Sequence, residues 1–95
     1  MSGWLYILEC ADGTYYVGST RNLEHRIYQH TQGEGSKYTA KRMPIKLVCA
    51  IEFPDVNEAY QREKQVQGWS RAKREALIKG EFDKLPELAK KKWRK

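Results

Sequence analysis

Five side chains in the first two thirds of the sequence have the types and spacing that suit phosphodiester chemistry. They are two tyrosines, an arginine, a histidine and a glutamate: Tyr6, Tyr16, Arg26, His30 and Glu63. Hydrolysis of a phosphodiester uses a hard cation held by one or two carboxylates, a base that activates water, and a positive side chain that neutralises developing charge. The residue types match these requirements: Glu63 can hold the cation, a tyrosine or His30 can act as the base, and Arg26 can supply the positive charge.

A purely structural explanation of the same residues stays open. Arg26 and Glu63 can form a buried ion pair, with tyrosine hydroxyls satisfying the remaining polar atoms, because buried charges usually exist as pairs. The elements that carry these residues must therefore decide whether the five side chains converge.

The two tyrosines lie in a predicted β-hairpin. The β-rich runs "WLYILEC" and "TYYVG" flank the turn signal "ADG". A two-residue loop would place Tyr6 and Tyr16 on opposite faces of the hairpin. A three-residue loop at 11–13, with Gly13 left-handed, sets Leu8 opposite Tyr16 and puts both tyrosines on one face. We favour the three-residue loop because glycine adopts a positive φ without strain.

Arg26 and His30 lie in a predicted helix that Asn22 caps and that runs to about residue 31. At 100° per residue they share a stripe with Leu23 and Ile27, although helix burial normally avoids arginine and histidine. A mobile linker at 33–44 then leads to a third strand, "IKLVCAIEF".

Glu63 lies at the centre of the apolar stripe of a second predicted helix. Asp55 and Glu58 resemble a capping box at the start of this helix. Ser70 and Gly80 then bound a third helix, and "LPELAKKKWRK" is compatible with a last helical segment. These elements predict an α+β domain over residues 1–80, with a three-stranded antiparallel sheet flanked by helices in the order β-β-α-β-α-α. Residues 81–95 form a basic tail that is helical and packed on the domain if this last segment forms.

Composition narrows the class of protein but does not decide the function. The chain has 95 residues and a net charge of +6, yet five of its 18 basic residues lie in the tail "KKKWRK", so the body carries 13 basic against 12 acidic residues. Two isolated cysteines, Cys10 and Cys49, favour reduced core thiols over a disulfide or zinc scaffold. No run approaches the roughly 20 apolar residues of a membrane span. We expect a cytoplasmic, monomeric protein without a membrane anchor or an obligate protein partner.

The tripeptides "WLY" at 4–6 and "YVG" at 16–18, followed by Arg26, His30 and Glu63, resemble the paired motif and later residues of the GIY-YIG nuclease superfamily. The resemblance covers about residues 3–79. The length of the chain and the segment "GSKYT" are similar to the small stand-alone bacterial branch, whose members consist of the nuclease module alone.

This resemblance implies a role for each of the five residues. Glu63 would bind a loosely held Mg²⁺ or Mn²⁺, Tyr16 would be the water-activating base or its relay, and Tyr6 would be its partner near the phosphate. Arg26 would clamp the phosphate, and His30 would assist proton transfer. An ordinary tyrosine has a pKa of about 10 and is a poor base at neutral pH, so its role depends on the metal and Arg26, or on His30 as proton acceptor.

The implied activity is metal-dependent cleavage of DNA, including branched or flapped DNA, in repair, recombination or DNA turnover. We expect little sequence specificity because no second domain reads bases. The candidate nucleic-acid contacts are Ser19, Arg21, Lys37, Tyr38, Lys41 and Arg42. Tyr38 can stack on a base or pack on the domain, and the linker cations can bind phosphate or remain solvated. Two other functions stay open: a catalytically weak nucleic-acid-binding module of the same fold, and a protein-interaction module.

Overall fold

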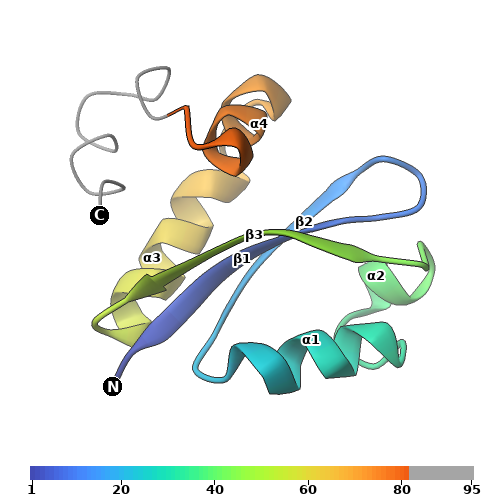
Figure 1. Ribbon diagram of the computed structural model, residues 1–95, viewed down its shortest axis with the longest axis horizontal. Helices are drawn as coiled ribbons and strands as arrows, with labels where there is room; N and C mark the ends of the chain where they lie inside the picture. The colour runs from blue at the N-terminus through green and yellow to red at the C-terminus, as the bar shows by residue number, and fades with distance from the viewer. Residues whose placement is uncertain (82–95) are drawn as a thin grey trace.

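The computed structural model describes residues 1–81, which form a three-stranded antiparallel sheet with helices on both faces (Figure 1). The elements in chain order are β1 (Gly3–Glu9), β2 (Tyr15–Thr20), α1 (Leu23–Thr31), α2 (Lys37–Ala40), β3 (Lys46–Phe53), α3 (Val56–Gln67) and α4 (Arg71–Lys79). The predicted α+β class and element order are confirmed, with α2 as an addition. The predicted helical segment at 85–95 lies outside the described residues.

The β1–β2 hairpin has the three-residue loop that the sequence favours. Leu8 lies opposite Tyr16, and Tyr6 lies opposite Gly18. Gly13 has a φ of +83°, and its N–H donates to the carbonyl of Cys10 at 2.9 Å. The two tyrosines therefore point to the same face of the sheet.

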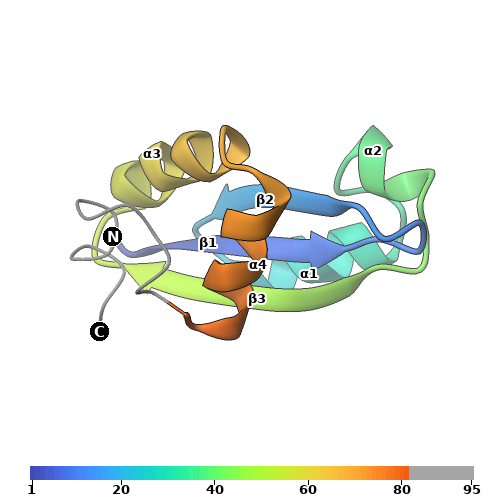
Figure 2. The same ribbon diagram turned by 90° about the horizontal axis from the view of Figure 1, so that it is seen from above.

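The strand order β2-β1-β3 makes β1 the central strand, and within residues 1–81 no strand pairs with the outer edge of β2, which is called the free edge below. Leu5 and Ile7 of β1 point to one face, and Tyr6 and Leu8 point to the other. The first face carries the hydrophobic core, against which α3 and α4 pack, and α1 lies on the opposite face (Figure 2). The buried core residues are Leu5, Ile7, Val17, Ile51, Phe53, Ala59, Val66, Ala76 and Leu77.

The helix starts follow the capping residues that the sequence shows. Asn22 accepts a hydrogen bond from the N–H of His25, and Ser70 accepts one from that of Lys73. Asp55 caps α3 as predicted, but it accepts from the N–H of Asn57, one position earlier than the amide that a capping box uses.

The segment at 33–44, which the sequence predicts to be a linker, contains the short helix α2. Ser36 caps the short helix α2 by accepting a hydrogen bond from the N–H of Thr39, which is fully buried. The N–H of Ala11 donates to the carbonyl of Arg42 at 2.9 Å, which joins the segment to the hairpin turn. These contacts hold the segment against the domain despite its glycines.

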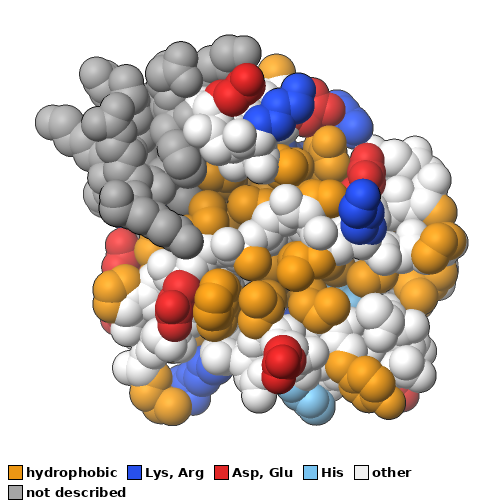
Figure 3. All heavy atoms as spheres, viewed as in Figure 1, with side chains coloured by type: hydrophobic (Ala, Val, Ile, Leu, Met, Phe, Trp, Pro, Cys, Tyr) orange, Lys and Arg blue, Asp and Glu red, His pale blue; other side chains and the backbone are white. Residues whose placement is uncertain are grey.

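The face of the domain on which β3 lies is mainly apolar. Hydrophobic side chains gather across the middle of this face, between α4 and α1, with charged side chains at the margins (Figure 3). The part of the face that is not covered by grey atoms lacks the continuous positive band that tracks a nucleic-acid backbone. None of the helices among residues 1–81 has the length and apolar content needed to cross a membrane.

Candidate active site at the edge of β2

A buried chain of hydrogen bonds connects β1, α1 and α2. The hydroxyl of Tyr6 lies 2.9 Å from Nε2 of His30, and Nδ1 of His30 lies 2.9 Å from the hydroxyl of Thr39. Tyr6 is 1 % exposed, and both His30 and Thr39 are 0 % exposed. When Thr39 donates its single hydroxyl hydrogen to the carbonyl of Ser36, at 3.3 Å, it accepts from His30 Nδ1, and Nε2 is left to accept from Tyr6.

Two glycines create the space for this chain. A Cβ atom at Gly18 would overlap the hydroxyl of Tyr6, and one at Gly35 would overlap Nδ1 of His30. Gly18 is the last residue of the "YVG" tripeptide, so the motif glycine is needed because the phenol of the first motif lies directly over it.

Burial sets the protonation of both ends of the Tyr6–His30 bond. It raises the pKa of Tyr6 well above the ordinary value, with Tyr16 adding to the rise and Arg26 opposing it. Burial also lowers the pKa of His30, and the positive charge of Arg26 lowers it further. The pair is therefore neutral at pH 7, a phenol bonded to an uncharged imidazole.

Tyr16 lies between this buried chain and solvent. Its ring centroid is 5.2 Å from that of His30 and 6.4 Å from that of Tyr6. Unlike Tyr6, Tyr16 is only partly buried. Of the two motif tyrosines, Tyr16 is therefore the one that a substrate can reach without rearrangement of the domain.

Glu63 reaches the edge of β2 from α3, on the other face of the sheet. Its Oε1 accepts a 2.6 Å hydrogen bond from the hydroxyl of Ser19, and its Oε2 accepts a 2.8 Å bond from Nε2 of Gln67. The same Gln67 nitrogen lies 3.4 Å from the carbonyl of Val17. These donors fix the carboxylate beside β2 and still leave lone pairs on both of its oxygens.

Arg26 and Glu63 form no ion pair, although both lie among the described residues. The structural alternative that paired them is therefore not realised. Arg26 is half-buried on α1, and its charge, like that of Glu63, acts on Tyr6. Tyr16 and Ser19 point to opposite faces of β2. The candidate active site therefore has one half on the α1 side, with Tyr16, and one half on the α3 side, with Glu63, and the two halves can meet only around the free edge of this strand.

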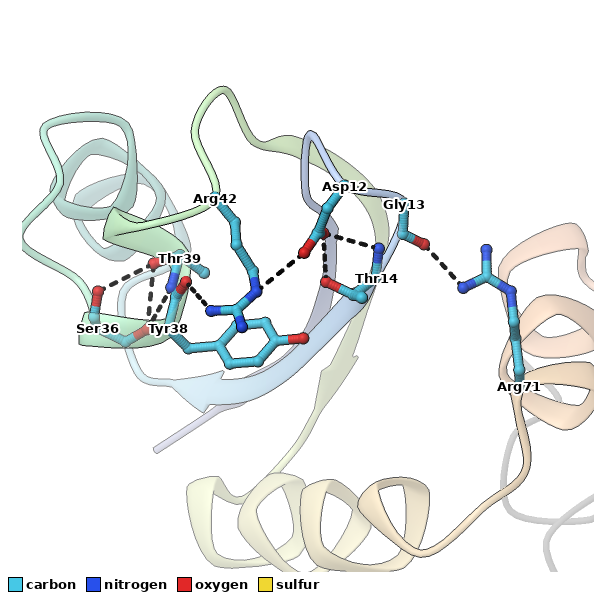
Figure 4. Close-up of polar contacts among 8 residues, drawn as sticks. All are labelled: Asp12, Gly13, Thr14, Ser36, Tyr38, Thr39, Arg42 and Arg71. Carbon is cyan, nitrogen blue, oxygen red and sulfur yellow. Dashed lines mark hydrogen bonds and ion pairs between the residues drawn. The ribbon is translucent and has the colours of Figure 1, made fainter.

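The candidate nucleic-acid contacts fall into two groups. Arg21, Lys37 and Lys41 are exposed and available to solvent. Ser19 is bonded to Glu63, and Arg42 is held within the domain: its Nε donates to Asp12 Oδ2 at 3.0 Å, and its guanidinium stacks 3.8 Å above the ring centroid of Tyr38 (Figure 4).

The donor set fits a cation that keeps most of its water. Within residues 1–81 no group of three or more His, Cys, Asp and Glu side chains is placed to hold a metal. Mg²⁺ is commonly bound through one or two carboxylates together with substrate phosphates. Glu63, with both oxygens oriented, is suited to that mode of binding.

Comparison with known proteins agrees with this fold. Residues 2–76 match the model of the GIY-YIG catalytic domain. A UPF0213 protein of Natronomonas pharaonis is 45% identical over 78 residues, which are 82% of this chain and 92% of the relative. The UPF0213 protein BH0048 of Halalkalibacterium halodurans is 44% identical over 78 residues, 82% of this chain and 83% of that protein.

Two solution NMR structures are also similar. The structure of BH0048 has a TM-score of 0.55 at 43% identity and covers 83% of this chain and 84% of its own. The structure of EF2693 from E. faecalis has a TM-score of 0.58 at 31% identity and covers 84% of this chain and 85% of its own. The chain therefore belongs to the GIY-YIG family. It is similar to the small UPF0213 proteins, which are little longer than the matched region.

Sequence reasoning missed two residues that orient the candidate active site. Gln67 follows Glu63 by four residues on α3, and this spacing is a signal that can identify it. Thr39 gives no such signal, because it meets His30 only when α2 folds back over α1. Ser19 was expected to contact nucleic acid, whereas the structure shows it as a hydrogen-bond donor to Glu63.

Proposed function

We propose that the protein is a divalent-metal-dependent endonuclease that hydrolyses DNA phosphodiester bonds. The observation that carries this proposal is the oriented carboxylate of Glu63, held by Ser19 and Gln67 at the strand edge that also presents Tyr16. An isolated carboxylate with two donors at a solvent-reachable edge suits cation binding better than core packing.

Each candidate residue has a proposed role in this reaction. Glu63 holds Mg²⁺ or Mn²⁺, which when bound polarises the phosphate and neutralises its charge. Tyr16 accepts a proton from the attacking water as a phenolate, or as a neutral phenol it accepts that proton while passing its own to solvent, and Arg26 binds the phosphate. Water oxygen forms a bond to phosphorus, the bond to the leaving oxygen breaks, and the leaving oxygen takes a proton from solvent.

Tyr6 and His30 are positioning residues in this proposal. Both are buried, so they act on the substrate through Tyr16, whose ring packs against His30. This assignment differs from the expectation that Tyr6 approaches the phosphate itself.

The setting of the activity is part of the proposal. We infer a monomer that acts in the cytoplasm on branched or flapped DNA during repair, recombination or turnover. The buried thiol of Cys10 is free, as is usual in a reducing compartment. We also propose low sequence specificity, because the elements among residues 1–81 all belong to the nuclease-like fold and none forms a separate base-reading unit.

The test is cleavage of plain, flapped and branched DNA in Mg²⁺ or Mn²⁺ by the wild type and by Glu63→Gln. We expect the variant to lose at least about 100-fold in rate. Glu58→Gln, which changes another glutamate of α3, is the matched control and should cleave like the wild type. Equal cleavage by Glu63→Gln would contradict the proposed site. Salt-sensitive DNA binding without cleavage by the wild type would identify a binding module instead.

A further inference from the structure

A small cavity opens beside the candidate active site, along the free edge of β2. Its volume is about 250 Å³, and its lining residues are Tyr15, Tyr16, Val17, Tyr38, Gln67 and Arg74. Three of them are consecutive in β2 and point alternately to the two faces of the sheet. The cavity therefore wraps around the strand edge, as the candidate active site does.

The size and chemistry of this cavity suit one flat heteroaromatic ring system. Pockets for drug-sized ligands occupy about 300–1,000 Å³, so this cavity is smaller than that class. Its aromatic walls offer the stacking surface that single-stranded nucleic acid uses, and an arginine adds cation–π attraction. Glutamine and arginine side chains also recognise the polar edges of bases through hydrogen bonds.

The aromatic walls are fixed before any ligand arrives. Arg42 stacks on Tyr38 and donates to the carbonyl of the same residue at 3.0 Å, while Asp12 holds the guanidinium from the other side (Figure 4). The ring of Tyr15 is held in a similar way, because Arg71 stacks 4.4 Å from its centroid and donates to the carbonyl of Gly13 at 2.8 Å. Such preorganisation lowers the entropic cost of binding a planar group.

The charges around the cavity also favour an occupant attached to a phosphate backbone. Asp12 is paired with Arg42 at 3.0 Å, and Glu75 is paired with Arg71 at 3.1 Å. Arg74 donates to the backbone carbonyls of Val66 and Gln67, so its positive charge stays unpaired by a carboxylate among the described residues.

A peptide strand is a poorer occupant of this edge. The carbonyl of Val17 points outward and already accepts from Gln67, so an added strand would lose part of the backbone ladder that provides its affinity.

We propose that this cavity receives one unstacked base of a DNA strand whose adjoining phosphate lies at the candidate active site. The inference rests on the proposed function and adds its substrate preference. Tyr16 belongs to both the cavity and the candidate active site, so the base and the cleaved phosphate are neighbours along one strand. A paired base must first leave the helix, at a cost of a few kcal/mol. Unpaired, flapped or mismatched DNA is therefore preferred over regular duplex.

The test measures binding rather than cleavage, in EDTA, so that catalysis plays no part. The probes are a short single-stranded oligonucleotide with a central 2-aminopurine and its fully paired duplex. We expect the wild type to quench the single-stranded probe. We expect Tyr38→Ala to remove this quenching and to weaken single-stranded binding about 10-fold more than duplex binding. Tyr38→Phe keeps the ring and should retain the quenching, as should Tyr60→Ala, which removes an exposed tyrosine elsewhere.

Each result has a distinct meaning. Unchanged quenching in Tyr38→Ala, or equal loss of single-stranded and duplex binding, would overturn the base cavity and leave the endonuclease proposal intact. Cleavage that does not depend on Glu63 would contradict the proposed site and leave the binding result valid. A wild-type protein that binds neither probe would overturn the base cavity, whereas the endonuclease proposal is tested separately by cleavage in Mg²⁺ or Mn²⁺.

Discussion

Ser19 on β2 and Glu63 on α3 are joined by a 2.6 Å hydrogen bond that links the edge strand to the carboxylate of the candidate active site. The residues are 44 positions apart in sequence, and each lies on the core side of the sheet. The bond fixes which way Oε1 points, and Gln67 does the same for Oε2. The carboxylate is therefore held by two donors that do not themselves react.

Loss of the Ser19 hydroxyl should weaken the binding of the metal ion by Glu63 rather than the folding of the domain. We expect Ser19→Ala to lower the cleavage rate about 10- to 100-fold, because partners of a metal-binding carboxylate contribute that much. The concentration of Mg²⁺ or Mn²⁺ at half-maximal activity should rise as well. Ser19→Thr retains the donor and should remain within a few-fold of the wild type. An unchanged metal dependence in Ser19→Ala would show that this bond does not orient a metal ligand.

Thr39 should matter for stability because it completes the buried chain through His30. Thr39→Val keeps the shape of the side chain but leaves Nδ1 of His30 without this partner, so we expect a loss of about 1–3 kcal/mol in the free energy of unfolding. Thr39→Ser keeps the hydroxyl and should lose less. Urea unfolding of the three proteins measures the difference. Equal stability of the wild type and Thr39→Val would mean that water replaces the hydroxyl at no cost.

The lowered pKa of His30 predicts how stability depends on pH. The unfolded chain binds a proton at this histidine near pH 6.5, whereas the folded protein resists protonation until a lower pH because the imidazole is buried. The unfolded state thus holds more protons in this window, and the free energy of unfolding falls as the pH is lowered from about 7 to about 5.

The matched comparison for this pH dependence is with the second histidine of α1. His30→Gln should flatten the slope of unfolding free energy against pH, whatever its effect on absolute stability. His25→Gln, which removes an exposed side chain, should keep the wild-type slope. If both variants keep the slope, other groups cause the pH dependence.

Gly18 should tolerate no side chain, because the phenol of Tyr6 occupies the space of a Cβ atom. We expect Gly18→Ala to cost about 1–3 kcal/mol through overpacking and to lower cleavage by displacing Tyr6 from His30. Gly68→Ala is the control: the nearest atom to its added methyl group is a backbone oxygen at 3.5 Å, and φ is −85°. That variant should be neutral or slightly stabilised. Similar melting temperatures for the two variants would contradict the close contact at Gly18.

Local signals in the sequence predicted most of the fold. The turn glycine Gly13 sets the hairpin register, and Asn22, Asp55 and Ser70 mark the helix starts, because each acts within a few residues of its own position. The helix α2 escaped prediction because its four residues, which follow two glycines, carry no periodic pattern, and Thr39 meets His30 only in the folded domain.

The sequence indicates which residues are candidates for the active site, but it does not indicate which of them contact one another. Periodicity placed Arg26 and Glu63 on inward faces of their helices, and both an ion pair and a catalytic arrangement satisfied that pattern. Only the packing of α3 along β2 decides between them, since it gives the carboxylate to Ser19 and Gln67. Contacts between side chains that lie dozens of residues apart in the sequence depend on tertiary packing, so local sequence signals do not reveal them.

The hairpin loop at 11–13 has a consequence far from its own position. One residue more or fewer would slide β2 by a step, turning Tyr16 toward the core and Ser19 toward α1. Tyr16 would then lose its packing against His30, and Glu63 would lose the hydroxyl of Ser19. Arg42 and Arg71 bond to this loop at Asp12 and Gly13, so a surface turn remote from the candidate active site determines which way its β2 side chains face.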